Sequence, residues 1–237
     1  MTEFIKVEGI IIKKKDINDS DRLLTVFTNS LGKQNIIYKG INKSKKRDKN
    51  ASDILSYSKF ILYKKGENYI GSNIDLIENF ENIKKDMEKI GISLYICFIL
   101  IEVLRFGERN SKLYDLSLNS LKYINKETEK EKYYLLLVYY LYKILVEEGL
   151  NFNLEEGKYF SIKEAYFGKK LKEDSIFLND FQVNIIQKIY YGKIKELLKE
   201  KLKVEDIKSV LELFENYFNY HLEENLNFKR YIWEEKE

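Results

Sequence analysis

Residues 22–39 read Arg-Leu-Leu-Thr-Val-Phe-Thr-Asn-Ser-Leu-Gly-Lys-Gln-Asn-Ile-Ile-Tyr-Lys, and this stretch decides the fold of the amino-terminal part. Two runs rich in β-branched and aromatic residues, Arg22–Thr28 and Gln34–Lys39, flank the turn segment Asn29-Ser30-Leu31-Gly32. Such runs favour strands, and Gly32 can adopt the positive φ that a short hairpin connection needs. The stretch therefore predicts two antiparallel strands joined by a tight turn.

Runs of the same kind lie on both sides of this hairpin. They are Phe4–Lys14, Lys59–Lys64 and Tyr69–Ile74, and the segment Lys65-Gly66-Glu67-Asn68 predicts a second hairpin turn. Five short strands within residues 1–78 suit a small closed barrel, because closure removes the exposed sheet edges.

From about Asn79 onward the apolar residues recur with a helical period. The following features are expected: a helix starting near Ile83 that breaks or kinks at Gly91, a helix over Leu113–Ile124, a central buried helix over Tyr133–Val146 ending before Gly149, and a last helix over Glu205–Glu223. Residues 151–175 contain two glycines, Gly157 and Gly168, and no helical period, so an irregular segment with at most a short hairpin is expected. The predicted fold is therefore α+β, with a barrel at 1–78 and a helical domain at 79–237 that carries an irregular insertion at about 151–178.

Composition excludes several protein classes. With 44% hydrophobic residues, the 237-residue chain can bury a core, which argues against general disorder. A single cysteine, Cys97, cannot form an internal disulfide, and no basic-then-apolar leader opens the chain. The longest apolar stretch, 92–104, is shorter than the roughly 20 residues that span a bilayer. We expect a soluble, cytoplasmic protein.

The sequence offers little catalytic chemistry. Its only histidine, His221, lies near the end of the last helix, and Cys97 lies in the most apolar segment, where thiols are generally inert. No glycine-rich phosphate loop is present, and Asp19, Asp21 and Arg22 are expected to fix the turn into the second strand. We therefore expect no enzyme, no catalytic residues and no cofactor.

Positive charge is concentrated in one segment. Residues 1–80 carry 15 Lys/Arg against 10 Asp/Glu, and residues 33–49 hold seven basic residues against Asp48 alone. A solvated basic loop after a strand can contact successive phosphates without reading sequence. The alternative is a merely soluble linker, since 36 of the 41 basic residues are lysine.

Aromatic residues of the predicted strands offer stacking surfaces for single strands. The candidates are Phe27, Tyr38, Phe60, Tyr63 and Tyr69. Because alternate residues of a strand face inward, we expect one or two of them to remain accessible.

The order of these signals resembles a known family, the bacterial DNA repair protein RecO, a recombination mediator. The matching segments are Gly9–Lys13, Asp19–Thr28, Gly32-Lys33, Lys39-Gly40, Leu76–Phe80, Ile83–Asp86, Lys112–Leu116, Tyr220-His221-Leu222, Leu226 and Phe228-Lys229. Each segment is short, but together they span nearly the whole chain.

This resemblance implies an OB-fold barrel followed by a helical domain. It also implies a nucleoid-associated protein that binds single- and double-stranded DNA, anneals strands, and works with RecR to load RecA onto strands coated by single-stranded-DNA-binding protein. The acidic, apolar-ended tail of that coating protein would bind a pocket on the helical domain. The DNA-facing residues carried over are those of the basic loop: Lys39, Lys43, Lys45, Lys46, Arg47 and Lys49.

The chain departs from the family pattern at a metal site. Many members hold zinc with four cysteines after the central helix, the first pair spaced Cys-x-x-Cys. Here Gly157 and Phe160 stand where those ligands would fall, and the second pair is missing. Tetrahedral zinc needs four such ligands, so we expect no metal. Packing of Tyr159, Phe160, Tyr166 and Phe167 is expected to hold the insertion together instead.

Two other functions fit the same features. The first alternative is a protein-interaction adaptor whose barrel docks a partner rather than DNA, consistent with the net charge of −2 beyond residue 80. A weaker alternative is RNA binding, because lysines that contact phosphates do not distinguish the sugars.

Overall fold

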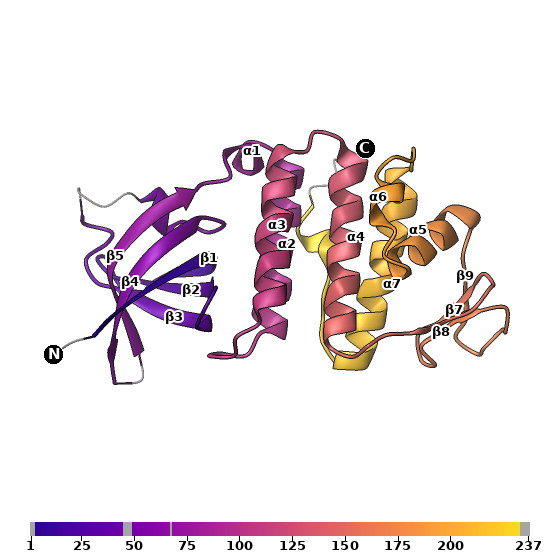
Figure 1. Ribbon diagram of the computed structural model, residues 1–237, viewed down its shortest axis with the longest axis horizontal. Coiled ribbons are helices and arrows are strands. Elements are labelled where there is room, and N and C mark those ends of the chain that lie inside the picture. Colours follow the sequence, from indigo (N-terminus) through magenta and orange to yellow (C-terminus); the bar gives the residue numbers. More distant parts are fainter. Residues whose placement is uncertain (1–2, 45–48, 67, 233–237) are drawn as a thin grey trace. The chain divides into compact units, whose positions relative to one another are not determined.

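The computed structural model describes residues 3–44, 49–66 and 68–232 (Figure 1). The chain forms two compact units, Met1–Asn125 and Lys126–Glu237. The first unit contains a β-barrel and the helices α1 to α3, and the second contains a small sheet and the helices α4 to α7.

Five strands form the barrel of the first unit. They are β1 (Phe4–Asp16), β2 (Arg22–Thr28), β3 (Gly32–Tyr38), β4 (Tyr57–Lys65) and β5 (Asn68–Glu78). The barrel is closed in the order β1-β2-β3-β5-β4: β1 pairs with β4, and β3 meets β5 in a short parallel contact. All five predicted strands are present, which confirms the α+β fold with an amino-terminal five-stranded barrel.

The turn between β2 and β3 is the predicted one. Gly32 has φ +67°, and the Thr28 hydroxyl donates to the Gly32 carbonyl at 2.9 Å while accepting from the Leu31 amide at 2.9 Å. In the second predicted turn Gly66 has φ +62°, whereas Glu67 lies outside the described residues.

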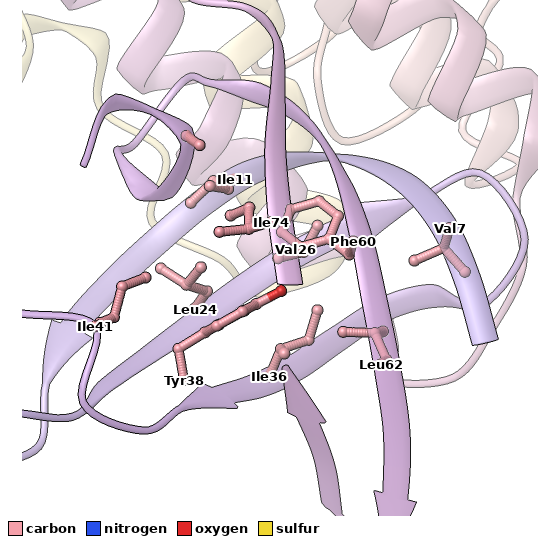
Figure 2. Close-up of a cluster of buried hydrophobic side chains, with 11 residues drawn as sticks. Val7, Ile11, Leu24, Val26, Ile36, Tyr38, Ile41, Phe60, Leu62 and Ile74 are labelled. Carbon is pink, nitrogen blue, oxygen red and sulfur yellow. The ribbon is translucent and has the colours of Figure 1, made fainter. Parts of the chain in front are cut away.

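The inward faces of the strands build the barrel core, which Figure 2 shows in close-up. Tyr38 crosses this interior and is fully buried, and its hydroxyl donates to the Asn73 carbonyl at 2.9 Å. The ring fits because Gly71 has no side chain: a Cβ there would lie 2.1 Å from the ring. The other buried members are Val7, Ile11, Leu24, Val26, Ile36, Ile41, Ala51, Phe60, Leu62 and Ile74.

A β-bulge in β1 changes which side chains face outward. Ile11 pairs with Val26, but the next pair is Lys13 with Thr25, so Ile12 has no partner on β2. An extra residue shifts the inward–outward alternation by one. Without the bulge, Lys13 would point into the barrel like Ile11. With the bulge, Lys13 and Lys15 point outward, on the same side of the sheet as their β2 partners Thr25 and Leu23.

Helices of the first unit cover part of the outer barrel surface. They are α1 (Glu81–Lys84), α2 (Met87–Val103) and α3 (Ser111–Lys126), and a short 3-10 turn, η1, spans Asn50–Ser52. Phe27 of β2 is fully buried, with its ring 5.4 Å from that of Tyr114 of α3.

The predicted break at Gly91 is wrong, because α2 runs unbroken through it. The interruption comes earlier, at Asp86, whose carboxylate accepts from the amides of Glu88 and Lys89 and so starts α2. A glycine inside a helix costs only about 1 kcal/mol relative to alanine. Burial of the apolar residues on both sides of Gly91 outweighs that cost.

The second unit is mainly helical. Its helices are α4 (Lys130–Glu147), α5 (Asp180–Tyr190), α6 (Ile194–Leu197) and α7 (Val204–Leu222), with a 3-10 turn, η2, at Phe228–Arg230. Helices α4 and α7 pack against each other, and both occupy predicted positions. Helix α5 was not predicted, although Asn179 and Gln182 form a capping box at its start.

The segment predicted as irregular contains a small four-stranded sheet. Its strands are β6 (Asn153–Leu154), β7 (Tyr159–Ser161), β8 (Tyr166–Gly168) and β9 (Ile176–Phe177), in the order β6-β8-β7-β9. Strands of two or three residues are too short to show a period in the sequence, so the sequence predicted an irregular segment with at most a short hairpin. The antiparallel strands β7 and β8 form such a hairpin.

Candidate nucleic-acid interface

The predicted basic loop begins at the end of β3 and is tied down at its base. The Gly40 amide donates to the Asp21 carboxylate at 2.8 Å, and the Asn42 amide donates to the Ser20 carbonyl at 3.1 Å. The Gly40 hydrogen bond lowers the pKa of Asp21. In the turn before β2 the same carboxylate accepts from the Asn18 side-chain amide at 3.2 Å and from the Ser20 hydroxyl at 3.1 Å, so Asp21 fixes this turn as expected and also holds the start of the loop.

Three of the six predicted DNA-facing residues lie in the described part of the chain. Lys39, Lys43 and Lys49 are exposed, whereas Lys45, Lys46 and Arg47 lie outside the described residues. Among residues 3–44, 49–66 and 68–232, no acidic side chain forms an ion pair with Lys43 or Lys49. By contrast, Lys14 pairs with Asp53.

Arg22 also has an acidic partner, Asp16, at 2.7 Å. Its guanidinium also donates a hydrogen bond to the Ser52 hydroxyl, at 3.1 Å. These bonds fix the entrance to β2, as expected for Arg22, so its charge is engaged in the fold.

Sequence reasoning missed a second group of cations, which lies on β1. On the outer face, Lys13 of β1, Thr25 of β2 and Asn35 of β3 form one row across the three strands, and Lys15 lies next to Leu23 in the following row. Lys13 and Lys15 are both exposed. The run Lys13-Lys14-Lys15 was visible in the sequence, but the bulge at Ile12 decides which of these lysines share a face.

These outward residues border a hollow of about 330 Å³. Lys13, Lys15, Leu23, Thr25 and Asn35 line it from the strands, and Lys33, Ile101 and Phe106 line it from the other side. We call this hollow the β1–β3 groove. In five-stranded barrels of this type, the face of strands 2 and 3 is the usual surface for oligonucleotides.

Lys33 forms the inner wall of the groove and is 5% exposed. Its ammonium donates to the Ile101 carbonyl at 2.7 Å and lies 4.7 Å from the centre of the Phe106 ring. Burial lowers the pKa of Lys33, against the opposing effect of Glu102. Lys33 therefore joins the end of α2 to the barrel, and its charge is largely engaged there.

The segment after α2 is fixed to the edge of β3. The Gly107 amide donates to the Lys33 carbonyl at 3.0 Å. Gly32 lies so close to Glu108 that a Cβ at position 32 would be 2.0 Å from the Glu108 carbonyl oxygen. These contacts hold Phe106 at the rim of the groove with 59% of its surface exposed.

The five barrel aromatics divide as expected. Phe27, Tyr38 and Phe60 are fully buried, whereas Tyr63 and Tyr69 are partly exposed. Two exposed aromatic side chains of this unit, Phe4 and Phe106, were not among the sequence candidates.

The two residues considered for catalysis have structural environments. Cys97 is 1% exposed, and burial raises the pKa of its thiol to about 12. His221 lies with Nε2 2.8 Å from the Ile162 carbonyl oxygen, and its ring is 4.5 Å from that of Tyr217. These positions agree with the interpretation of both as structural residues.

Residues at the family's zinc position do not fit a metal. Gly157 packs so closely that a Cβ would lie 1.9 Å from the Gly168 carbonyl carbon, and Phe160 is fully buried. Phe160 contacts Phe152 and Tyr217 at ring distances of 5.1 and 5.6 Å. Within the described residues, no three His, Cys, Asp or Glu side chains gather as a metal would require.

Of the four aromatics expected to hold the insertion, Phe160, Phe167 and Tyr166 are buried and Tyr159 is partly exposed. Phe152, which was not predicted, lies at the centre of the same cluster.

Comparison with known proteins finds matches along nearly the whole chain. A family model described as "Recombination protein O N terminal" matches residues 1–80, and one described as "Recombination protein O C terminal" matches residues 84–230. In the described part of the chain, no helix has the length and apolar character needed to cross a bilayer.

Three curated relatives, each named "DNA repair protein RecO", illustrate the similarity. The one from Caldanaerobacter subterraneus is 33% identical over 53% of this chain and 52% of its own length. The one from Clostridium perfringens is 30% identical over 84% of this chain and 88% of its own length. The one from Desulforamulus reducens is 25% identical over 96% and 93%, respectively. For the first two relatives found, the matched region spans about half of their length.

Proposed function

The chain belongs to the RecO family of DNA repair proteins, and from this premise we propose that it is a recombination mediator that binds DNA and anneals complementary strands. In this role it acts without a catalytic site. It works with RecR to load RecA onto strands coated by single-stranded-DNA-binding protein, whose acidic tail binds its helical domain.

The observation that carries the DNA-binding part is a set of exposed lysines, two on β1 and two in the loop after β3. Lys13, Lys15, Lys43 and Lys49 are exposed, and none of them forms an ion pair with an acidic residue of the described chain. Ammonium groups of this kind contact phosphates, release counterions and give affinity without sequence readout.

Salt dependence of single-strand binding tests this proposal. If about five cations contact phosphates, the slope of log K against log salt should be roughly −3.5, a loss on the order of a hundredfold between about 50 and 200 mM. Replacing Lys43, Lys45, Lys46 and Arg47 by Ala should flatten the slope markedly.

A matched variant controls for net charge. Lys193, Lys195, Lys199 and Lys201 are exposed lysines of the second unit, and their replacement by Ala removes the same charge. This control should keep the slope of the intact chain. An unchanged slope in the loop variant would move the DNA site elsewhere, and the absence of salt-dependent binding by the intact chain would refute DNA binding.

Partner binding is tested separately. A pull-down with single-stranded-DNA-binding protein should succeed with the intact partner and fail when its carboxy-terminal tail is deleted. Partner binding without DNA binding would instead support the adaptor function.

A further inference from the structure

We propose that the β1–β3 groove holds one unstacked nucleobase of a single strand, with Phe106 as the stacking platform and with Lys13 and Lys15 contacting the flanking phosphates. This inference rests on the proposed DNA-binding function and adds a base-binding site outside the basic loop. It also gives a physical reason for a preference for single strands, because the bases of a duplex are already stacked and paired.

Phe106 has the properties of a preformed stacking surface. A large apolar side chain is normally buried, yet Phe106 is 59% exposed. Its backbone is not free to fold the ring inward, because the Gly107 amide is bonded to the Lys33 carbonyl and Glu108 packs against Gly32. The Lys33 ammonium lies 4.7 Å from the ring centre, and the exposed part of the ring remains available to a base. Stacking on such a ring is tolerant of sequence, because every base has a π-face.

The floor of the groove offers a hydrogen-bond donor. The Thr25 hydroxyl donates to Oδ1 of Asn35 at 2.9 Å, which orients the amide. Within the described chain, no acceptor is bonded to Nδ2 of Asn35, and this residue is exposed. An amide N–H can donate to the ring nitrogens or carbonyl oxygens that all bases carry. An apolar peptide side chain would leave this donor unused, so the floor favours a base.

The lysines that can bind phosphates lie at the rim of the groove and not in its interior. Lys13 and Lys15 are exposed, and neither has an acidic partner in the described residues. Lys33, the cation inside the groove, already donates to the Ile101 carbonyl and has Glu102 in its neighbourhood. A phosphate would therefore bind at the rim, which leaves the volume between Leu23, Ile101 and Phe106 for an uncharged ring.

The test compares two oligonucleotides with the same phosphates: oligodeoxythymidylate and an abasic chain of equal length. One stacked base is worth roughly 5- to 150-fold in affinity. We expect the intact protein to bind the thymidylate chain about tenfold more tightly. Phe106→Ala should bring the two affinities close to equality without changing the salt slope, and Phe106→Trp should keep the preference.

Two further variants separate stacking from charge. Replacing Lys13 and Lys15 by Gln should make the slope shallower by about 1.4, because each single-strand phosphate contact contributes about 0.7, and should leave the base preference intact. Phe181→Ala removes an aromatic residue of the second unit that is 52% exposed and should change neither quantity.

The outcomes distinguish this inference from the proposed function. If the intact chain shows no salt-dependent DNA binding, the proposed function fails. If DNA binds but the abasic chain binds equally well, or if folded Phe106→Ala keeps the preference, the base site is refuted while DNA binding stands. If both oligonucleotides bind equally well and an acidic peptide with an apolar end displaces them from the intact chain, the groove binds a protein ligand instead.

Discussion

At the scale of single residues, Gly32 and Gly40 distinguish two reasons why a position requires glycine: a left-handed backbone and a close neighbour. Both have φ +67°. At Gly40 an added Cβ would meet no atom within 4 Å, whereas at Gly32 it would lie 2.0 Å from the Glu108 carbonyl oxygen. Gly32 is therefore needed both for the turn and for the approach of the segment that carries Phe106.

Alanine at each position measures these two contributions. Gly40→Ala should cost about 1–2 kcal/mol, the usual penalty of a left-handed backbone with a side chain. Gly32→Ala carries the same penalty and must also displace the Glu108 backbone, so its total cost should exceed about 3 kcal/mol. Urea unfolding of both variants checks this. Equal losses of stability would mean that the Glu108 segment is not held against β3.

At the scale of elements, composition was enough to locate the strands but not to predict which side chains point outward from the barrel. The strands were predictable because β-branched and aromatic runs alternate with turn residues, as in Arg22–Thr28. The outward placement of Lys13 and Lys15 was not, because a one-residue bulge reverses the alternation and has no sequence signature. Phe106 was missed for a related reason: the segment after α2 gains its position only by docking on β3.

The helical part also has features that the sequence predicts and features that it does not. Helices α4 and α7 were predictable from their apolar periodicity, whereas Gly91 misled because burial on both sides of it overrides its low helix propensity. Helix α5 carried a readable signal, the pair Asn179 and Gln182 at capping-box spacing. The DNA-binding role of the basic loop remains a prediction, and three of its residues, Lys45, Lys46 and Arg47, lie outside the described residues.

The small sheet of the second unit is expected to depend on aromatic packing and not on a metal. Phe160→Ala removes a fully buried ring and should cost about 3–5 kcal/mol. Phe177→Ala, in the neighbouring strand β9, removes a ring that is 63% exposed and should stay within about 0.5 kcal/mol of the intact chain. Thermal unfolding with and without a chelator should give the same midpoint. Stoichiometric zinc in metal analysis would contradict this account.

At the scale of the whole molecule, the compact units and the predicted domains divide the chain at different places. The sequence predicts a domain boundary after residue 78, where β5 ends. The first compact unit continues to Asn125 and includes α2 and α3. The contacts that join these helices and the segment between them to the barrel include Lys33 with Ile101, Phe27 with Tyr114, and Gly32 with Glu108.

Two fragments decide which boundary describes an independent folding unit. Residues 1–126 should unfold cooperatively in urea. Residues 1–80 should be less stable by about 3 kcal/mol or more, because the outer side of Phe27 and its neighbours becomes exposed. Far-UV circular dichroism during urea unfolding measures both. Equal stability of the two fragments would place the boundary after residue 78 and would make the helical contacts unimportant for the barrel.

The central claim is that the exposed cations of the barrel and of its basic loop bring DNA strands together, and an annealing assay tests it most directly. Complementary oligonucleotides are mixed with the intact chain, with the loop variant lacking Lys43, Lys45, Lys46 and Arg47, and with the charge-matched control of the second unit, each with and without single-stranded-DNA-binding protein. We predict that the intact chain and the control accelerate annealing and that the loop variant is markedly slower. Failure of the folded intact chain to accelerate annealing in either condition would contradict the account.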